Sequence, residues 1–265
     1  PRWRHARAWS KASIASSARP LFLLPEHMLP FPAAAPVQVP VRGGDAFPVH
    51  RIYCVGRNFA DHAREMGAST PASPAERGRP VFFLKPTDAV VTDGVVPYPP
   101  GTRELHHEVE LVVALGRDAP PAGLDRDGAA SLVYGCAVGL DLTRRDLQAE
   151  AKAKSLPWDI GKSFDASAPI SEIVSGIGPG DLATCSLELR VNGELRQRGV
   201  LSDLIWNVED ILHELSKLYA LRAGDLVFMG TPAGVGALHV GDRFVASLDG
   251  IVELHGRIAP PVASH

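Results

Sequence analysis

The sequence contains 265 residues, of which 45% are apolar and 22% are charged, and its formal net charge is −3. This length and composition suit a globular protein with a sizeable core. The mean hydropathy is +0.02, and no apolar run reaches the roughly 18 residues typical of a membrane span. Lys and Arg are scattered along the chain, which also argues against a nucleic-acid partner.

The three cysteines, Cys54, Cys136 and Cys185, are widely spaced and lie in apolar or strand-like surroundings. An odd number in such surroundings is typical of buried free thiols rather than of a disulfide framework. The cysteine pattern therefore predicts a reducing compartment, the cytoplasm.

Residues 1–46 are predicted to form an N-terminal extension and arm, partly disordered or artefactual. Residues 1–27 are rich in Arg, Ala and Ser and contain one acid, Glu26. This composition superficially resembles an organelle transit peptide, but it lacks an apolar stretch followed by a small-residue cleavage site. Met28 is an alternative natural start. We expect a single folded domain over residues 47–265.

The first half of this domain is predicted to contain several strands and one short helix. The helix begins after Asn58, a favourable N-cap residue, and continues for about two turns to Met66. The strands are short apolar runs bounded by Gly and Pro. They are predicted at residues 51–55, 81–84, 109–115 and 132–140.

The second half alternates helices with hairpins. One helix is predicted over residues 144–154 with Thr143 as its N-cap, and another has its apolar residues between Val208 and Tyr219 on one face. Asn192-Gly193 and Asp249-Gly250 predict tight hairpin turns, because these residues tolerate positive φ. The strands are predicted at residues 187–191, 194–198, 225–229, 244–248 and 251–257. We therefore predict one α+β, β-dominated domain of several packed sheets.

Two glutamates lie at the start of a predicted strand, in the segment His106-His107-Glu108-Val109-Glu110. Side chains two residues apart on a strand share a face, so Glu108 and Glu110 place two carboxylates side by side. Either this face is solvated, or a hard cation such as Mg²⁺, Mn²⁺ or Ca²⁺ neutralises the pair. Asp141 follows the apolar strand that ends at Leu140. It is either a third ligand or an anion that stabilises the next helix N-terminus.

A histidine, a glutamate and a lysine have the chemistry needed for catalysis. His62 and Glu65 are three residues apart and share a face of the short helix. The pair is either a general base with its orienting carboxylate or an ordinary surface pair. Lys162 lies where neither helix nor strand is predicted. It is either a loop lysine or a positive charge for a developing oxyanion.

Five motifs occur in a fixed order along the chain. They are Tyr53-Cys-Val-Gly-Arg-Asn-Phe-Ala-Asp-His62-Ala-Arg-Glu65-Met, Glu108-x-Glu110, Gly139-Leu-Asp141-Leu-Thr-Arg-Arg145-Asp-Leu-Gln148, Gly161-Lys162-Ser-Phe and Gly230-Thr231-Pro-Ala-Gly-Val-Gly. With these motifs the sequence resembles the fumarylacetoacetate hydrolase family over roughly residues 47–259. The resemblance implies layered mixed β-sheets in a roll or sandwich, a homodimer, and a bound Mg²⁺ or Mn²⁺.

The resemblance also implies a role for each matching residue. The implied metal ligands are Glu108, Glu110 and Asp141. The implied catalytic residues are His62 and Glu65, which activate water, and Lys162. The implied substrate-binding residues are Arg145, Gln148 and Thr231.

Within the family, the first and third motifs most resemble bacterial acylpyruvate hydrolases, in particular fumarylpyruvate hydrolases of gentisate catabolism. The implied reaction is metal-dependent hydrolysis of a carbon–carbon bond in a 2,4-diketo acid, with fumarylpyruvate giving fumarate and pyruvate. One alternative is oxaloacetate decarboxylation, or action on another acylpyruvate, at the same site. A more distant alternative is a non-catalytic binding protein with the same fold.

Overall fold

The computed structural model describes residues 31–65, 67, 76–121 and 123–262. The predicted helix end at Met66 lies outside these residues. The chain divides into two units, Pro1–Ala35 and Pro36–His265, and residues 31–35 of the first unit carry no regular secondary structure. Among the described residues, no helix has the length and apolar character needed to cross a membrane. The boundary at residue 46 stays a prediction.

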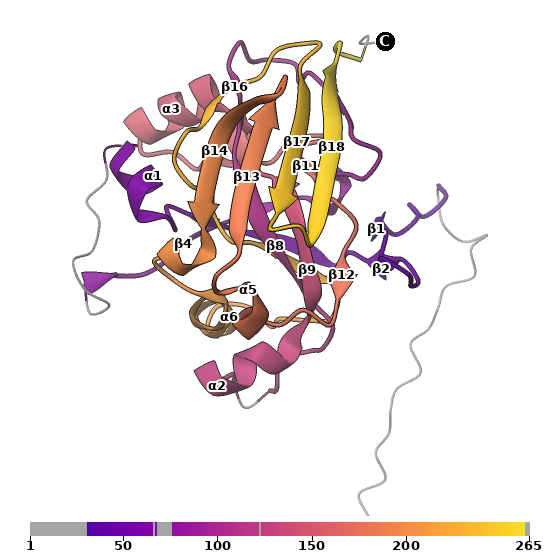
Figure 1. The fold of residues 1–265 in the computed structure, drawn as a ribbon, viewed down its shortest axis with the longest axis vertical. Coiled ribbons are helices and arrows are strands. Elements are labelled where there is room, and N and C mark those ends of the chain that lie inside the picture. Colours follow the sequence, from indigo (N-terminus) through magenta and orange to yellow (C-terminus); the bar gives the residue numbers. More distant parts are fainter. Residues whose placement is uncertain (1–30, 66, 68–75, 122, 263–265) are drawn as a thin grey trace, which may run out of the picture. The chain divides into compact units, whose positions relative to one another are not determined.

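Two large sheets form most of the second unit (Figure 1). The six-stranded sheet has the order β12 (Val174–Ser175), β9 (Val133–Leu140), β8 (Val109–Leu115), β15 (Asp225–Phe228), β3 (Arg51–Gly56), β4 (Val81–Lys85). The five-stranded sheet has the order β14 (Glu194–Val200), β13 (Ser186–Val191), β17 (Arg243–Leu248), β18 (Val252–Ala259), β6 (Val95–Pro97). Each combines antiparallel pairs with one parallel pair, β15–β3 and β18–β6. The prediction of a β-dominated α+β fold with mixed sheets is confirmed.

Smaller elements surround these sheets. The short strands are β10 (Thr143–Arg144), β7 (Leu105–His107) and β16 (Gly236–Ala237) in one sheet, and the pairs β1 (Gln38–Val39) with β2 (Phe47–Pro48) and β11 (Ala168–Pro169) with β5 (Val90–Val91). The helices are α1 (Ala60–Glu65), α2 (Arg126–Ala129), α3 (Arg145–Ala153), α4 (Asp159–Lys162), α5 (Pro179–Leu182) and α6 (Val208–Ser216). The described residues also include the 3₁₀ turns η3 (Thr87–Ala89), η4 (Ala130–Leu132) and η5 (Leu201–Asp203).

Strand β8 is the centre of the core because both of its faces are buried. Val109, Leu111 and Val113 belong to the cluster between the two large sheets, which lie one in front of the other in Figure 1. Val112 and Ala114 belong to a second cluster on the opposite face. This two-sided burial explains the nearly continuous apolar sequence of β8. Glu110 interrupts that sequence.

The predicted hairpin turns are confirmed. Asn192 and Gly193 have φ values of 53° and 86°, and Asp249 and Gly250 have φ values of 38° and 73°. Positive φ at both turn residues matches the type I′ turn that joins twisted antiparallel strands. These turns depend on local sequence, which is why the sequence alone predicts them.

Two predicted helix caps are wrong. The Asn58 side chain does not cap α1. It donates to the carbonyls of Trp206 and Met229 at 3.0 and 2.7 Å and accepts the Trp206 N–H at 2.8 Å. Thr143 lies in β10, and Arg144 occupies the N-cap of α3 without a capping hydrogen bond from its side chain. Both polar side chains have tertiary partners instead.

Two further boundaries differ from the prediction. Lys162, predicted to lie outside regular structure, is the last residue of α4. Helix α6 ends at Ser216, so Leu218 and Tyr219 lie beyond it, and Leu218 is exposed. Asn207 caps α6 by accepting the Asp210 N–H at 2.9 Å.

Gly230 provides a test of how tightly the turn after β15 is packed. Its φ is 96°, and an added Cβ would lie 2.8 Å from the Asn58 Cβ and 3.1 Å from the Val55 carbonyl oxygen. Gly230→Ala combines a left-handed backbone with a steric clash, so we expect it to lower the free energy of unfolding by about 2–4 kcal/mol. Urea unfolding measures this loss.

The matched control for this substitution is Gly101→Ala. Gly101 has a φ of 75° with no atom within 4 Å of an added Cβ, so only the backbone cost of about 1 kcal/mol applies. Equal losses for the two variants would contradict tight packing around Gly230.

Candidate active site

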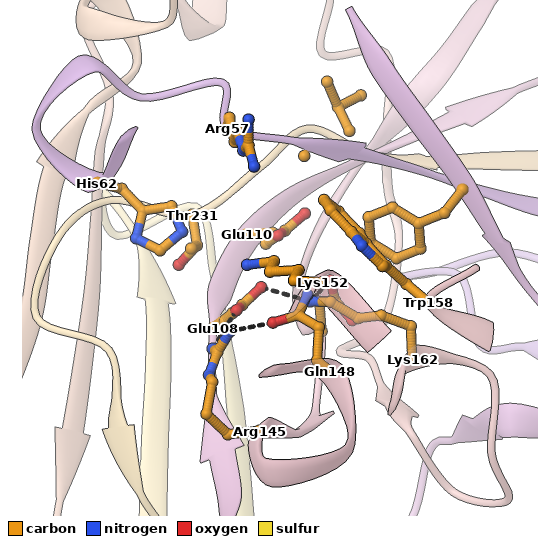
Figure 2. Close-up of a pocket in the computed structure, with 14 residues that line it drawn as sticks. Arg57, His62, Glu108, Glu110, Arg145, Gln148, Lys152, Trp158, Lys162 and Thr231 are labelled. Carbon is orange, nitrogen blue, oxygen red and sulfur yellow. Dashed lines mark hydrogen bonds and ion pairs between the residues drawn. The ribbon is translucent and has the colours of Figure 1, made fainter. Parts of the chain in front are cut away.

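A pocket opens where β8 begins and β9 ends, and most of the predicted functional residues line it (Figure 2). It contains about 390 Å³ of open space, part of it continuous with solvent. The predicted residues in its lining are His62, Glu108, Glu110, Asp141, Arg145, Gln148, Lys162 and Thr231. Glu65 is not part of the lining but contacts His62.

Strand register brings the three carboxylates together. In the antiparallel pair β8–β9, Val109 lies opposite Leu140, and the Asp141 N–H donates to the Glu108 carbonyl at 2.9 Å. Oxygen atoms of Glu108, Glu110 and Asp141 lie within 4.8 Å of one another, and all three residues are at most 5% exposed. A solvated outer face is therefore wrong for this pair of glutamates.

Three buried or half-buried cations offset this negative charge. The Lys162 Nζ donates to Glu108 at 2.7 Å, to Asp141 at 2.6 Å and to the Thr143 hydroxyl at 2.8 Å. The Arg145 guanidinium pairs with the other oxygen of Glu108, and the Lys85 Nζ lies 2.9 Å from Asp141 Oδ1. Burial opposes the charged form of Lys162, but Asp141 and Glu108 outweigh it and raise the pKa of that lysine.

The two glutamates differ in their environments. Burial raises the pKa of Glu108, but Lys162 and Arg145 outweigh it and hold that pKa below its usual value. Among the described residues, the Glu110 carboxylate accepts a single hydrogen bond, from the Gly230 N–H at 2.8 Å. Burial, Asp141 and Glu108 therefore raise the pKa of Glu110 well above its usual value. Glu110 needs a further positive charge to be stable as a carboxylate.

The donor set fits a divalent cation. Although Lys85 lies near Asp141 Oδ1, the contact lacks hydrogen-bond geometry, so this buried oxygen has no hydrogen bond among the described residues. A buried acceptor without a partner is costly. Three carboxylates with free acceptor capacity suit an oxygen-seeking ion such as Mg²⁺ or Mn²⁺.

The first turns of α3 bring two further polar side chains into the pocket. Arg145 Nη1 donates to Gln148 Oε1 at 2.6 Å, so one side chain orients the other. Arg145 Nε also donates to His106 Nδ1 at 3.4 Å. Burial and Arg145 lower the pKa of His106 to about 4, which keeps this acceptor neutral.

Thr231 is oriented by Gln197 of β14. The Gln197 amide nitrogen donates to the Thr231 hydroxyl oxygen at 2.8 Å and to the Pro232 carbonyl at 2.9 Å. Its carbonyl oxygen accepts the Val109 N–H at 3.1 Å and lies 2.8 Å from His107 Nδ1. All these contacts are buried, so the orientation of the amide is fixed.

His62 lies on the same side of the carboxylates as Thr231 (Figure 2). His62 Nδ1 is 3.4 Å from Glu65 Oε2, and Glu65 also accepts the Gly234 N–H at 3.2 Å. Burial lowers the pKa of His62, while Glu108 and Glu65 partly oppose that effect. The imidazole is therefore neutral near pH 7, as a general base must be.

The pocket also contains residues that the sequence analysis missed. Its lining includes Arg57, Lys152 and Trp158. Two further residues contact the lining: Lys85 pairs with Asp141, and Gln197 donates to Thr231. Lys152 follows Gln148 by four residues, so helix periodicity was a signal that could have found it. No local signal indicates Gln197, which lies within the second strand of a hairpin, β14.

Comparison with known proteins gives consistent matches. A model of the family described as "Fumarylacetoacetate (FAA) hydrolase C-terminal" matches residues 51–259. The mitochondrial oxaloacetate tautomerase of Rattus norvegicus is 43% identical over 210 residues, covering 78% of this chain and 90% of the relative. The fumarylpyruvate hydrolase of Ralstonia sp is 41% identical over 192 residues, covering 69% and 98%.

A solved structure is also similar. It is the fumarylpyruvate hydrolase of Pseudomonas aeruginosa in complex with Mn²⁺ and pyruvate, with 44% identity, a TM-score of 0.81 and coverage of 88% of this chain and 99% of that chain. The sequence resemblance is thereby confirmed. The chain is an enzyme of the fumarylacetoacetate hydrolase family.

Proposed function

We propose that this enzyme hydrolyses a carbon–carbon bond in a 2,4-diketo acid, with fumarylpyruvate as its substrate and fumarate and pyruvate as products. The observation that carries the proposal is the cluster of three buried carboxylates beside a neutral His62 in one pocket. The two similar fumarylpyruvate hydrolases support it, one of them solved with Mn²⁺ and pyruvate.

Glu108, Glu110 and Asp141 would hold Mg²⁺ or Mn²⁺ in this proposal. The ion, when bound, would act as a Lewis acid on oxygens of the substrate. Lys162 has its three N–H groups engaged by Glu108, Asp141 and Thr143. It can donate to the substrate only when another cation satisfies one of those carboxylates.

His62 would remove a proton from the attacking water. Glu65 accepts the Nδ1–H of the ring, which leaves Nε2 as the basic nitrogen. Water adds to the 4-keto carbon, the bond between C3 and C4 breaks, and its electron pair passes to the pyruvate fragment. The protonated His62 then returns the proton to that fragment.

The remaining pocket residues would bind and polarise the substrate. Gln148, fixed by Arg145, is placed to donate to an oxyanion together with Lys162. Gln197 donates to the oxygen of Thr231, so the Thr231 hydroxyl proton is left for a substrate carboxylate. Arg145 adds a positive charge beside these oxygens.

Tautomerisation of oxaloacetate is a second candidate function. It is favoured by the similarity to oxaloacetate tautomerases at 41–43% identity. The same His62 could move a proton between C3 and the enol oxygen without attack by water. Decarboxylation of oxaloacetate at this site is a further alternative. A non-catalytic role is set aside, because the family is one of enzymes.

The proposal also covers the oligomeric state, the metabolic role and the location of the enzyme. A homodimer and a role in aromatic catabolism rest on the resemblance alone. A cytoplasmic location is supported by three cysteines that are free and buried, as expected in a reducing compartment.

A side-by-side assay tests the proposed reaction. The purified enzyme is supplied with Mg²⁺ or Mn²⁺ and with fumarylpyruvate, acetylpyruvate or oxaloacetate. We expect the highest kcat/KM for fumarylpyruvate, with fumarate and pyruvate formed in equal amounts. Faster enol–keto conversion or CO₂ release from oxaloacetate, with no fumarylpyruvate cleavage, would replace the proposal by the corresponding alternative.

Asp141→Asn tests the metal assignment. The substitution keeps the side-chain volume but removes a charged ligand, so we expect Mn²⁺ affinity in calorimetry to fall at least about tenfold. Asp146→Asn is the control, because Asp146 accepts hydrogen bonds from the Thr102 hydroxyl and the Arg103 N–H and does not line the pocket. Unchanged Mn²⁺ affinity in Asp141→Asn would contradict the assignment.

His62→Ala tests the general base. We expect kcat to fall by about 10²–10⁴ while Mn²⁺ affinity is retained. Because burial lowers the pKa of His62 from 6.5, the neutral base is lost only as pH falls through that lowered value. The acid limb of the wild-type kcat/KM profile should therefore lie below pH 6.5 and disappear in the variant.

The control for this test is His255→Asn, which alters an exposed histidine paired with Glu253. It should keep both the wild-type rate and the acid limb. An unchanged rate in His62→Ala would remove His62 from the mechanism.

A further inference from the structure

Two cations in the pocket have no acidic partner within the part of the chain that the structure describes. Lys85, Lys162 and Arg145 pair with the carboxylates. Arg57 and Lys152 also line the pocket, but the side chain of neither makes a hydrogen bond or ion pair with another residue in the described part of the chain. Unpaired cations beside an active site are typical of sites that bind an anion.

Trp158 holds these two cations at one wall of the pocket. The Lys152 Nζ lies 5.0 Å from the centre of the indole ring, and the Arg57 Cζ lies 6.0 Å from it. The ring is itself packed against Phe83, with 6.0 Å between ring centres. Cation–π attraction therefore holds both positive groups near the same ring despite their repulsion.

The backbone directs Arg57 towards this wall. Arg57 has a φ of 60°, in the left-handed region that non-glycine residues rarely adopt. The adjacent Asn58 is held by three hydrogen bonds to Trp206 and Met229. Strain of this kind is retained where the surrounding structure enforces it, often at ligand sites. In Figure 2, Arg57 lies on the side of the carboxylates opposite Arg145.

Helix α3 directs Lys152 into the same space. Arg145, Gln148 and Lys152 are separated by three and four residues and share one helical face. In Figure 2 the side chain of Lys152 extends from this helix into the pocket. Burial, Arg145 and Arg57 lower the pKa of Lys152 to about 8. An anion between Lys152 and Arg57 would relieve the repulsion that contributes to this shift.

We propose that Arg57 and Lys152, held against Trp158, bind a second carboxylate of the substrate and so select dicarboxylic diketo acids over acylpyruvates with an uncharged acyl end. This inference rests on the proposed function for the position of the 2-oxo acid group beside Glu108, Glu110 and Asp141. A substrate with an uncharged acyl end would leave both cations unpaired. A carboxylate at that end would accept hydrogen bonds from both.

A pair of non-cleavable ligands tests this selection. The ligands 2-oxoheptanedioate and 2-oxoheptanoate have the same chain length and the same 2-oxo acid group, and differ only in whether the far end is a carboxylate or a methyl group. Neither carries a 4-keto group, so neither can be hydrolysed. We expect calorimetry with the Mn²⁺-loaded wild type to give about 10–100-fold tighter binding of the dianion.

Two substitutions locate the source of the preference. Arg57→Gln and Lys152→Gln should each reduce the ratio of the two affinities by about fivefold or more, while 2-oxoheptanoate affinity stays within about twofold. The matched controls are Arg64→Gln and Lys154→Gln, which remove exposed cations already paired with Asp61 and Glu150. Both controls should keep the wild-type ratio.

The outcomes separate this inference from the proposed reaction. Equal affinity of the wild type for both ligands overturns the inference, even if fumarylpyruvate is hydrolysed. Equal loss of both ligands in Arg57→Gln and Lys152→Gln also overturns it, because it indicates a general defect of the pocket. A preference of the wild type for the dianion that falls in Arg57→Gln and Lys152→Gln supports the inference, even if the hydrolysis assay fails. A wild-type preference that both variants keep in full overturns it.

Discussion

Three carboxylates lie buried within 4.8 Å of one another, and the structure around them has to offset their repulsion and their loss of hydration. Uncompensated, such a cluster is strongly destabilising. Compensation comes from Lys85, Lys162 and Arg145, which belong to the end of β4, the end of α4 and the start of α3. The ion pairs with the carboxylates therefore help to fix the positions of these three elements.

The central sheet makes the cluster possible. Glu110 shares its face of β8 with Val112 and Ala114, and its register partner on β9 is Gly139. A Cβ at Gly139 would lie 2.7 Å from Phe228 and 2.9 Å from Val112, so only glycine fits there without a shift. Apolar packing on both faces keeps β8 and β9 in one register, and this register aligns Glu108 with Asp141.

The sequence predicts what depends on local or periodic patterns. The hairpins at Asn192-Gly193 and Asp249-Gly250 are of this kind, as are the buried strands and the sharing of one face by Glu108 and Glu110. Asn58 and Thr143 were assigned the wrong partners, because their side chains bond to residues brought near by the tertiary fold. Lys85 and Gln197 each lie 56 residues from Asp141 in the sequence, one before it and one after it. Their proximity to the site therefore follows only from strand order. The grouping of the site residues was predicted through family resemblance rather than through spacing.

Gln197 connects the five-stranded sheet to the pocket through its side-chain amide. Its nitrogen faces Thr231 and Pro232, and its oxygen faces Val109 and His107. The Thr231 hydroxyl can therefore direct its proton only away from Gln197, at any pH. The pocket thus has a neutral donor of fixed polarity beside His62 and Lys152, whose charges both vary with acidity. In the proposed reaction, the orientation of the substrate by Thr231 would therefore not depend on the titration of His62 or Lys152.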